Sequence, residues 1–102
     1  MRFSWDERKR ALNLTQHEVD FADAPKVLSG LTTTFEDDRF SYGEQRFVTL
    51  GFLNGVPVSI AHTESEDEIR VISFRRATSH EEEILFESVK DQLPPSSQHE
   101  AG

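Results

Sequence analysis

The hydrophobic pattern of the chain changes from helical to strand-like spacing and back again. Residues 2–5 alternate apolar with polar side chains, which suits a short strand. Four later stretches are rich in the β-branched and aromatic residues that strands favour: 31–37, 45–52, 56–64 and 68–77. From residue 79 onward the apolar positions return to helical spacing. We therefore expect strands in the middle of the chain, with helices before and after them.

Two helices are expected before the main run of strands. Asp6 can cap a helix over 7–16, whose apolar stripe would consist of Ala11, Leu12 and Leu14. The second helix has two possible starts, because either Asp20 or Asp23 can serve as its N-cap. Proline costs little in a first helical turn, so Pro25 favours a helical turn at 20–23 followed by a regular helix over 23–28, ended by Gly30.

A third helix is expected over 79–89, with Ile84, Leu85 and Val89 on its apolar face. Ser79 followed three residues later by Glu82 has the spacing of a capping box. The glutamates 81–83 would then lie in the first turn, where negative charge stabilises the positive end of the helix dipole. A local reason therefore exists for this acidic run.

The expected elements define the fold class. Asn54-Gly55 is a strong hairpin signal between two strands, and short turns between successive strands imply an antiparallel meander. The order β-α-α-β-β-β-β-α predicts an α+β fold, with helices packed on an antiparallel sheet. At 102 residues we expect one domain over 1–90, followed by a flexible C-terminal tail over 91–102.

Composition narrows the function classes. The net charge is −8, so a generally basic nucleic-acid-binding surface is excluded, and any polyanionic partner must meet a local basic site. The chain has no cysteine, and its four histidines are not spaced as metal ligands, so we expect neither a metal site nor a cofactor. The absence of a signal sequence and of a long apolar run predicts a cytoplasmic protein without membrane contact.

Positive charge gathers on the strand at 68–77, which carries Arg70, Arg75 and Arg76. Strict alternation would place Arg70 and Arg76 on one face of the sheet and Arg75 on the other. Their guanidinium groups need a partner, and two interpretations remain open. They can bind an anionic ligand, or they can pair with carboxylates, Arg70 across the strands and the other two with the glutamates 81–83.

Several motifs in a fixed order resemble the BrnT family of toxins from bacterial type II toxin–antitoxin pairs. They are W-D near the start, N-x-x-x-H at Asn13 and His17, R-F-x-T-L-G, H-T-E, and I-R-x-I-S-x-R-R-A-T. The resemblance runs from about residue 2 to residue 89. It implies a RelE-like fold and an endoribonuclease that blocks translation by cutting RNA without a metal. It also implies a BrnA-like antitoxin, through which the complex binds promoter DNA and assembles into oligomers.

The resemblance directs attention to two sets of residues. As catalytic candidates we take Arg70, Arg75, Arg76, His62 and Glu64, because arginine binds phosphate in a bidentate manner and histidine transfers protons near neutral pH. As RNA-binding candidates we take Lys9, Arg10 and His17. Each has a structural alternative: His62 shares strand parity with core positions, His17 can bind the last carbonyls of its helix, and Lys9 and Arg10 can belong to a solvated face.

The region after R-R-A-T is acidic in this chain, "SHEEEILFE", where a nuclease would be expected to carry positive charge. Negative charge beside a phosphate-binding site slows association and weakens binding. An alternative function is therefore a catalytically weak or inactive member that binds its antitoxin and takes part in transcriptional autoregulation. Without the resemblance, the composition is that of a small acidic interaction domain.

Overall fold

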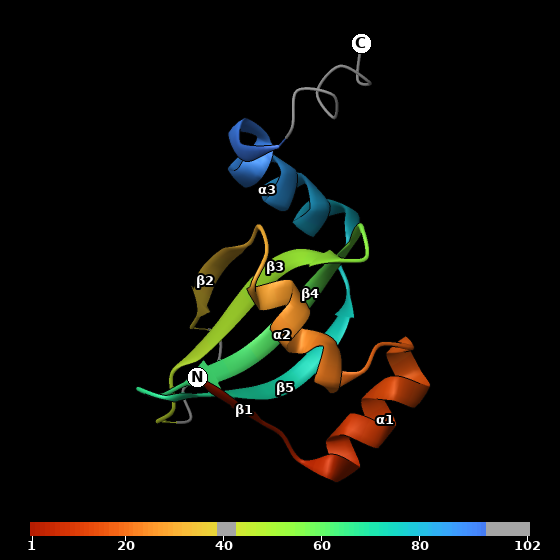
Figure 1. Ribbon diagram of the computed structural model, residues 1–102, viewed down its shortest axis with the longest axis vertical. Coiled ribbons are helices and arrows are strands. Elements are labelled where there is room, and N and C mark those ends of the chain that lie inside the picture. The colour runs from red at the N-terminus through yellow and green to blue at the C-terminus, as the bar shows by residue number, and fades with distance from the viewer. Residues whose placement is uncertain (39–42, 94–102) are drawn as a thin grey trace.

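The computed structural model describes residues 1–38 and 43–93 (Figure 1). Most of the expected flexible tail, residues 94–102, lies outside the described part. Its first residues belong instead to a 3₁₀ helix, and Leu93 packs against the core. The elements in chain order are β1 (Arg2–Ser4), α1 (Glu7–His17), the 3₁₀ helix η1 (Phe21–Asp23), α2 (Ala24–Leu28), β2 (Thr33–Asp37), β3 (Arg46–Leu53), β4 (Val56–Glu64), β5 (Glu68–Arg76), α3 (Ser79–Val89) and the 3₁₀ helix η2 (Lys90–Gln92).

The described strands form one mixed sheet in the order β1-β5-β4-β3-β2. Strands β2 to β5 make the expected antiparallel meander. The expectation of a wholly antiparallel sheet is wrong, however, because β1 pairs in parallel with the start of β5, Phe3 opposite Ile69. These two strands are separated by most of the chain, so no hairpin constrains their direction. The result is an α+β fold whose sheet has one parallel pair, at the edge formed by β1.

The hairpin between β3 and β4 turns at the expected dipeptide. Asn54 and Gly55 both have positive φ, 51° and 81°. Two successive residues in the left-handed region define the turn that matches the twist of paired strands. The strands on either side pair from Leu53 opposite Val56 onward.

Helices cover both faces of the sheet, and each face has its own apolar core. Under α2, side chains of η1, α2 and the sheet are almost fully buried: Phe21, Ala24, Val27, Val58, Ile60, Val71 and Phe74. On the opposite face α3 packs against the sheet through Val48, Leu50, Leu85 and Val89. Each fully buried valine, leucine, isoleucine or phenylalanine side chain stabilises the fold by about 1.5–3 kcal/mol. Gly51 allows α2 to approach, because a Cβ there would be 2.7 Å from Val27 Cγ1.

Helix α1 begins as expected and packs differently from the expectation. Asp6 caps it by accepting hydrogen bonds from the backbone N–H groups of Arg8 and Lys9, at 2.8 and 3.4 Å. The expected apolar stripe is wrong, since Leu12 and Leu14 are 57% and 45% exposed. The buried residue of the helix is a polar one, Asn13.

Asn13 fastens α1 to the edge of β5. Its Nδ2 donates to the carbonyl of Phe74 at 2.7 Å, and its Oδ1 accepts from the Phe74 N–H at 3.2 Å. The same Nδ2 also donates to the carbonyl of Val19 at 3.1 Å. Strand β1 pairs only with the start of β5, so this amide supplies at Phe74 the two bonds that a further strand would make.

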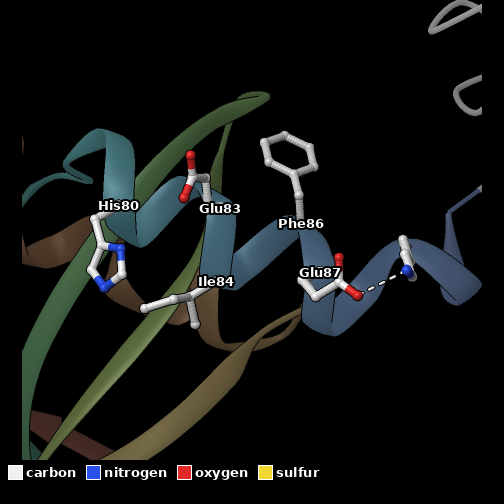
Figure 2. A pocket seen from close by; sticks show the side chains of 6 residues that line it. His80, Glu83, Ile84, Phe86 and Glu87 are labelled. Atoms are coloured by element: carbon white, nitrogen blue, oxygen red, sulfur yellow. Dashed lines mark hydrogen bonds and ion pairs between the residues drawn. The ribbon is translucent and has the colours of Figure 1, made fainter.

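The N-cap of α3 lies one residue before the expected one. The N-cap is Thr78, whose hydroxyl accepts from the Glu81 N–H, while the Glu81 carboxylate accepts from the Thr78 N–H. The box expected at Ser79 and Glu82 is therefore wrong by one position, because both pairs have the spacing that the motif needs. Figure 2 shows side chains of α3 that line an open pocket, with Glu83 and Phe86 on one side of the helix in this view and Ile84 on the other.

A β-bulge changes the faces on which the arginines lie. Ala61 pairs with Ser73 but His62 pairs with Val71, so Ile72 is an extra residue on β5. Paired residues share a face. Arg70, opposite Thr63, and Arg75, opposite Ser59, therefore lie on the same face, and Arg76, opposite Val58, lies on the other. The predicted grouping of Arg70 with Arg76 is wrong, because the alternation was counted without the bulge.

Replacing Asn13 with alanine should destabilise the protein by about 2–4 kcal/mol, because it leaves both backbone groups of Phe74 buried without partners. The measurement is the free energy of unfolding in urea. Thr15→Ala is the matched control, since among the described residues the Thr15 hydroxyl bonds only to the Ala11 carbonyl, on the exposed side of the same helix. That change should cost about 0.5 kcal/mol or less. Equal losses in the two variants would show that the Asn13 bridge contributes nothing specific.

Candidate active site

The end of α1 and the end of β5 meet around an open pocket of about 550 Å³. Its position follows from the Asn13 bridge. His17 lies one helical turn after Asn13, on the same side of α1, and Arg75 and Arg76 follow Phe74 directly. The bridge thus brings an imidazole and two guanidinium groups to one place. The pocket is lined by Gln16, His17, Glu18, Arg75, Arg76 and Thr78.

The two arginines of this pocket differ in their surroundings. Arg75 forms a bidentate ion pair with Glu81, at 2.7 and 3.0 Å, and also donates to the Arg76 carbonyl. Its guanidinium, with the Thr78 N–H, lowers the pKa of Glu81 below the ordinary value. Arg76 is exposed, and no carboxylate of the described residues lies within ion-pair distance of it. The expectation that the acidic run pairs with these arginines therefore holds for Arg75.

Arg70 lies far from this pocket. At about 3.3 Å per residue, Arg70 and Arg76 are about 20 Å apart along β5. Arg70 borders a separate hollow of about 280 Å³ with Glu64, Glu68 and Thr63. Within the described part of the chain no carboxylate comes within ion-pair distance of it. The structure thus separates Arg70 and Glu64 from the other two arginines.

His62 is fully buried, which removes it from the surface where a substrate could reach it. Its Nε2 shares a hydrogen bond of 2.8 Å with the Thr49 hydroxyl, which in turn bonds to the hydroxyl of Thr34 at 2.7 Å. Burial lowers the pKa of His62, although Glu64, 3.7 Å away, acts in the opposite direction. The ring also stacks on Phe47. This placement corrects the expectation of a catalytic His62 and fits the core alternative.

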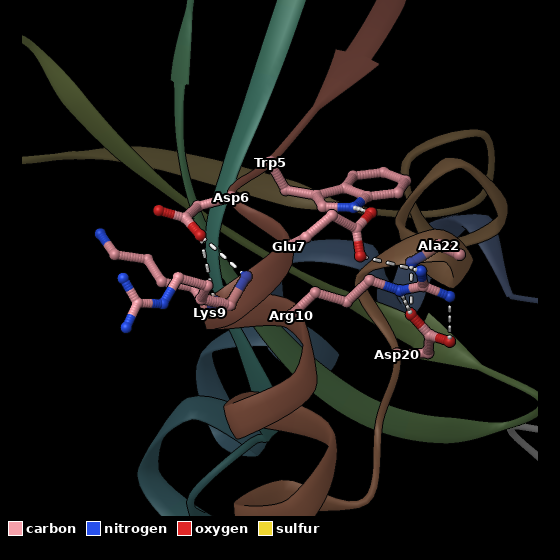
Figure 3. A network of polar contacts seen from close by, with 8 residues as sticks. Trp5, Asp6, Glu7, Lys9, Arg10, Asp20 and Ala22 are labelled. Atoms are coloured by element: carbon pink, nitrogen blue, oxygen red, sulfur yellow. Dashed lines mark hydrogen bonds and ion pairs between the residues drawn. The ribbon is translucent and has the colours of Figure 1, made fainter.

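Arg10 is held at the surface of the fold by polar contacts, as Figure 3 shows. Its guanidinium donates to both oxygens of Asp20, at 2.7 and 3.0 Å, reaches Glu7 at 3.3 Å, and lies over the Trp5 ring at 5.8 Å from its centroid. These carboxylates raise the pKa of Arg10, chiefly through the hydrogen bonds to Asp20. Arg10 therefore joins α1 to η1, and its part in RNA binding stays a prediction. Lys9 is exposed on the first turns of α1, away from His17.

The pocket at His17 brings together the groups that phosphate chemistry uses. A guanidinium binds phosphate oxygens in a bidentate manner and stays charged, and an imidazole can accept or release a proton near neutral pH. Among the described residues, no three histidine, aspartate or glutamate side chains are placed to share a metal ion. In the same part of the chain no helix is long and apolar enough to cross a membrane.

Sequence reasoning assigned His17 to RNA binding and missed Asn13 as the residue that positions it. The signal was present in the N-x-x-x-H spacing, which places both side chains on one side of a helix. Thr78, which lines the pocket and caps α3, was also missed. Its candidacy was hidden because Ser79 satisfies the same capping spacing one position later.

The fold and the pocket define a small α+β protein with a cationic, histidine-containing surface site. The family described as "Ribonuclease toxin, BrnT, of type II toxin-antitoxin system" matches residues 5–81, and the chain belongs to this family. A similar solved structure is the crystal structure of the Brucella abortus ribonuclease toxin, BrnT, with a TM-score of 0.63 and 28% sequence identity. The match covers 78% of this chain and 99% of that one. No curated protein matches the chain.

The ion pair between Arg75 and Glu81 predicts a dependence of stability on pH. Because the pKa of Glu81 is lowered in the folded state from 4.5, the unfolded chain takes up this proton first as the pH falls. The stabilisation is therefore present above about pH 4.5 and is lost as the pH falls through the folded-state pKa. The free energy of unfolding should decline more steeply between about pH 5 and pH 3 in the wild type than in Glu81→Gln.

Glu87→Gln is the control for this experiment, because Glu87 forms an exposed ion pair with Lys90 outside the pocket. Its pH profile should run parallel to that of the wild type. A Glu81→Gln profile as steep as the wild-type profile would contradict a coupled Arg75–Glu81 pair.

Proposed function

We propose that this chain is an endoribonuclease toxin whose active site is the pocket between His17 and Arg76. The observation that supports this most directly is the Asn13 bridge, which brings an exposed histidine to the same pocket as an exposed arginine that pairs with no carboxylate of the described residues. Membership of a ribonuclease toxin family supplies the substrate class. The proposed action is cytoplasmic, because the chain would cut RNA there and so stop translation.

The proposed reaction needs no metal. His17 accepts the proton of a ribose 2′-hydroxyl, and the 2′-oxygen attacks the adjacent phosphorus. The bond from phosphorus to the 5′-oxygen of the next nucleotide then breaks. The imidazolium returns the proton to that departing oxygen, which leaves a 2′,3′-cyclic phosphate and a free 5′-hydroxyl. Arg76 binds the phosphate and stabilises the additional negative charge that develops on its oxygens.

Arg75 has a different part in this proposal. Its guanidinium is tied to Glu81 in a bidentate pair, so its charge at the pocket is partly neutralised. The pair joins the end of β5 to the first turn of α3. We therefore assign Arg75 to positioning, because it holds the segment that carries Arg76 and Thr78. Arg70, Glu64 and Lys9 lie outside the proposed pocket.

The acidic character of the chain favours a second function. The Arg75–Glu81 pair withdraws one cation from the pocket, Glu18 lines it, and the net charge is −8. A member of this kind can bind its antitoxin and contribute to transcriptional autoregulation without cutting RNA. In that case the partner would be a BrnA-like protein, and contact with promoter DNA would come only through the complex.

Cleavage of a labelled oligoribonucleotide in the presence of EDTA tests the proposal. The wild type should release a 2′,3′-cyclic phosphate end. Arg76→Ala should slow cleavage by about 100- to 1000-fold, the usual effect of removing one donor from a preorganised site. His17→Ala should slow it by about 100-fold or more. Arg8→Ala, which removes an exposed arginine from α1 outside the pocket, is the matched control and should cleave like the wild type.

Induction of the chain in bacteria provides the second readout. The wild type should arrest growth, a co-expressed antitoxin should restore it, and Arg76→Ala should be harmless at equal expression. Cleavage by Arg76→Ala at the wild-type rate would reject this site, and loss of cleavage in Arg70→Ala instead would move it to the other end of β5. A wild type that neither cuts RNA nor arrests growth, yet binds the antitoxin, would establish the binding-only function.

A further inference from the structure

A groove between β2 and α3 is adjacent to the proposed active site, because Arg75 lines both. Its volume is about 380 Å³. Two of its apolar side chains are unusually exposed for their size, Phe35 at 41% and Ile84 at 37%. Val48 lies buried beneath them as part of the core on the α3 face of the sheet. We call this surface, with its apolar residues Phe35, Val48 and Ile84, the β2–α3 groove.

The rim of the β2–α3 groove is acidic. Its lining residues include four carboxylates and the guanidinium of Arg75, which is already bound to one of them. His80 is the remaining polar residue that lines the groove, and it stands on the same side of α3 as Ile84 (Figure 2). The four acidic residues are Glu36, Asp37, Asp38 and Glu81.

The combination of apolar floor and acidic rim selects among possible occupants. RNA carries one negative charge per phosphate, so it is repelled by this rim. A second copy of the chain would bring the same negative charge to the contact, on a molecule whose net charge is already −8. A protein segment that carries an apolar side chain between lysines or arginines is complementary to both features.

We propose that the β2–α3 groove is the docking site of the antitoxin, which inserts an apolar side chain between Phe35 and Ile84 and places basic residues against the acidic rim. This inference rests on the proposed function, because it takes the partner from the toxin–antitoxin family. It also gives Glu81, the first glutamate of the acidic run after R-R-A-T, a second part: Glu81 caps the start of α3 and borders the groove. An antitoxin bound in this groove would contact the Arg75–Glu81 pair, and Arg75 also lines the proposed active site.

Calorimetry with the purified antitoxin of the same toxin–antitoxin pair tests the proposal. Phe35→Ser combined with Ile84→Ser should raise the dissociation constant by about 30-fold or more, since both remove apolar anchors. Leu12→Ser is the matched control, because Leu12 is an equally apolar residue exposed on α1. It should change the dissociation constant by about 2-fold or less. Thermal unfolding of each variant establishes that the fold is retained.

The charged rim is tested separately. Glu36→Gln with Asp38→Asn should weaken binding and reduce its dependence on salt, whereas Glu66→Gln, at an exposed acidic position in the β4–β5 turn, should change neither. Unchanged affinity in the groove variants, or an equal loss in Leu12→Ser, would overturn the proposal. So would weaker RNA binding in Ile84→Ser, or a dimer of the wild type that this change dissociates.

The same preparations keep this inference separate from the proposed function. Phe35→Ser with Ile84→Ser should cut RNA at the wild-type rate and should resist inhibition by the antitoxin. A wild type without ribonuclease activity whose antitoxin binding still depends on the groove would reject the catalytic proposal and support the docking site. Active ribonuclease with groove-independent binding would do the reverse.

Discussion

One buried amide determines how the two halves of this protein meet. Asn13 exchanges two hydrogen bonds with the backbone of Phe74 and adds a third to Val19. A helix with exposed leucines on its surface has little apolar area with which to choose its position on the sheet. The hydrogen bonds of Asn13 fix the position of α1 instead, because a shift of α1 along β5 would leave buried polar groups without partners. The places of His17 and of the two terminal arginines of β5 follow from this contact.

The arginines of the molecule have different surroundings, which depend on the face of the sheet and the element that each belongs to. Arg10 joins α1 to η1 through Asp20, and Arg75 joins β5 to α3 through Glu81. Arg76 remains exposed at the pocket, and Arg70 stands about 20 Å away at the other end of the strand. An acidic chain can therefore keep a local cationic site. Of the glutamates of α3, Glu81 both caps the start of the helix and lines the β2–α3 groove.

Much of the fold was predictable because its signals are local. Asp6, the Asn54-Gly55 turn and the position of Pro25 each specify a cap, a hairpin or a helix start from a few neighbouring residues. The parallel pairing of β1 was not predictable, since it depends on contacts between two segments that lie far apart in the sequence. The prediction of which arginines share a face was wrong because of one inserted residue. A bulge at Ile72 reverses the alternation of side chains along β5. No residue type in 68–77 indicates that a bulge is present.

The location of RNA on the folded protein tests the central claim most directly. Chemical-shift mapping by NMR with a 2′-O-methyl oligoribonucleotide, which cannot be cleaved by the proposed reaction, reports the contact surface without turnover. The account predicts that the largest shifts occur at the His17 ring and at the amides of Arg76 and Thr78. Shifts concentrated at Arg70 and Glu64, with none at His17, would contradict it.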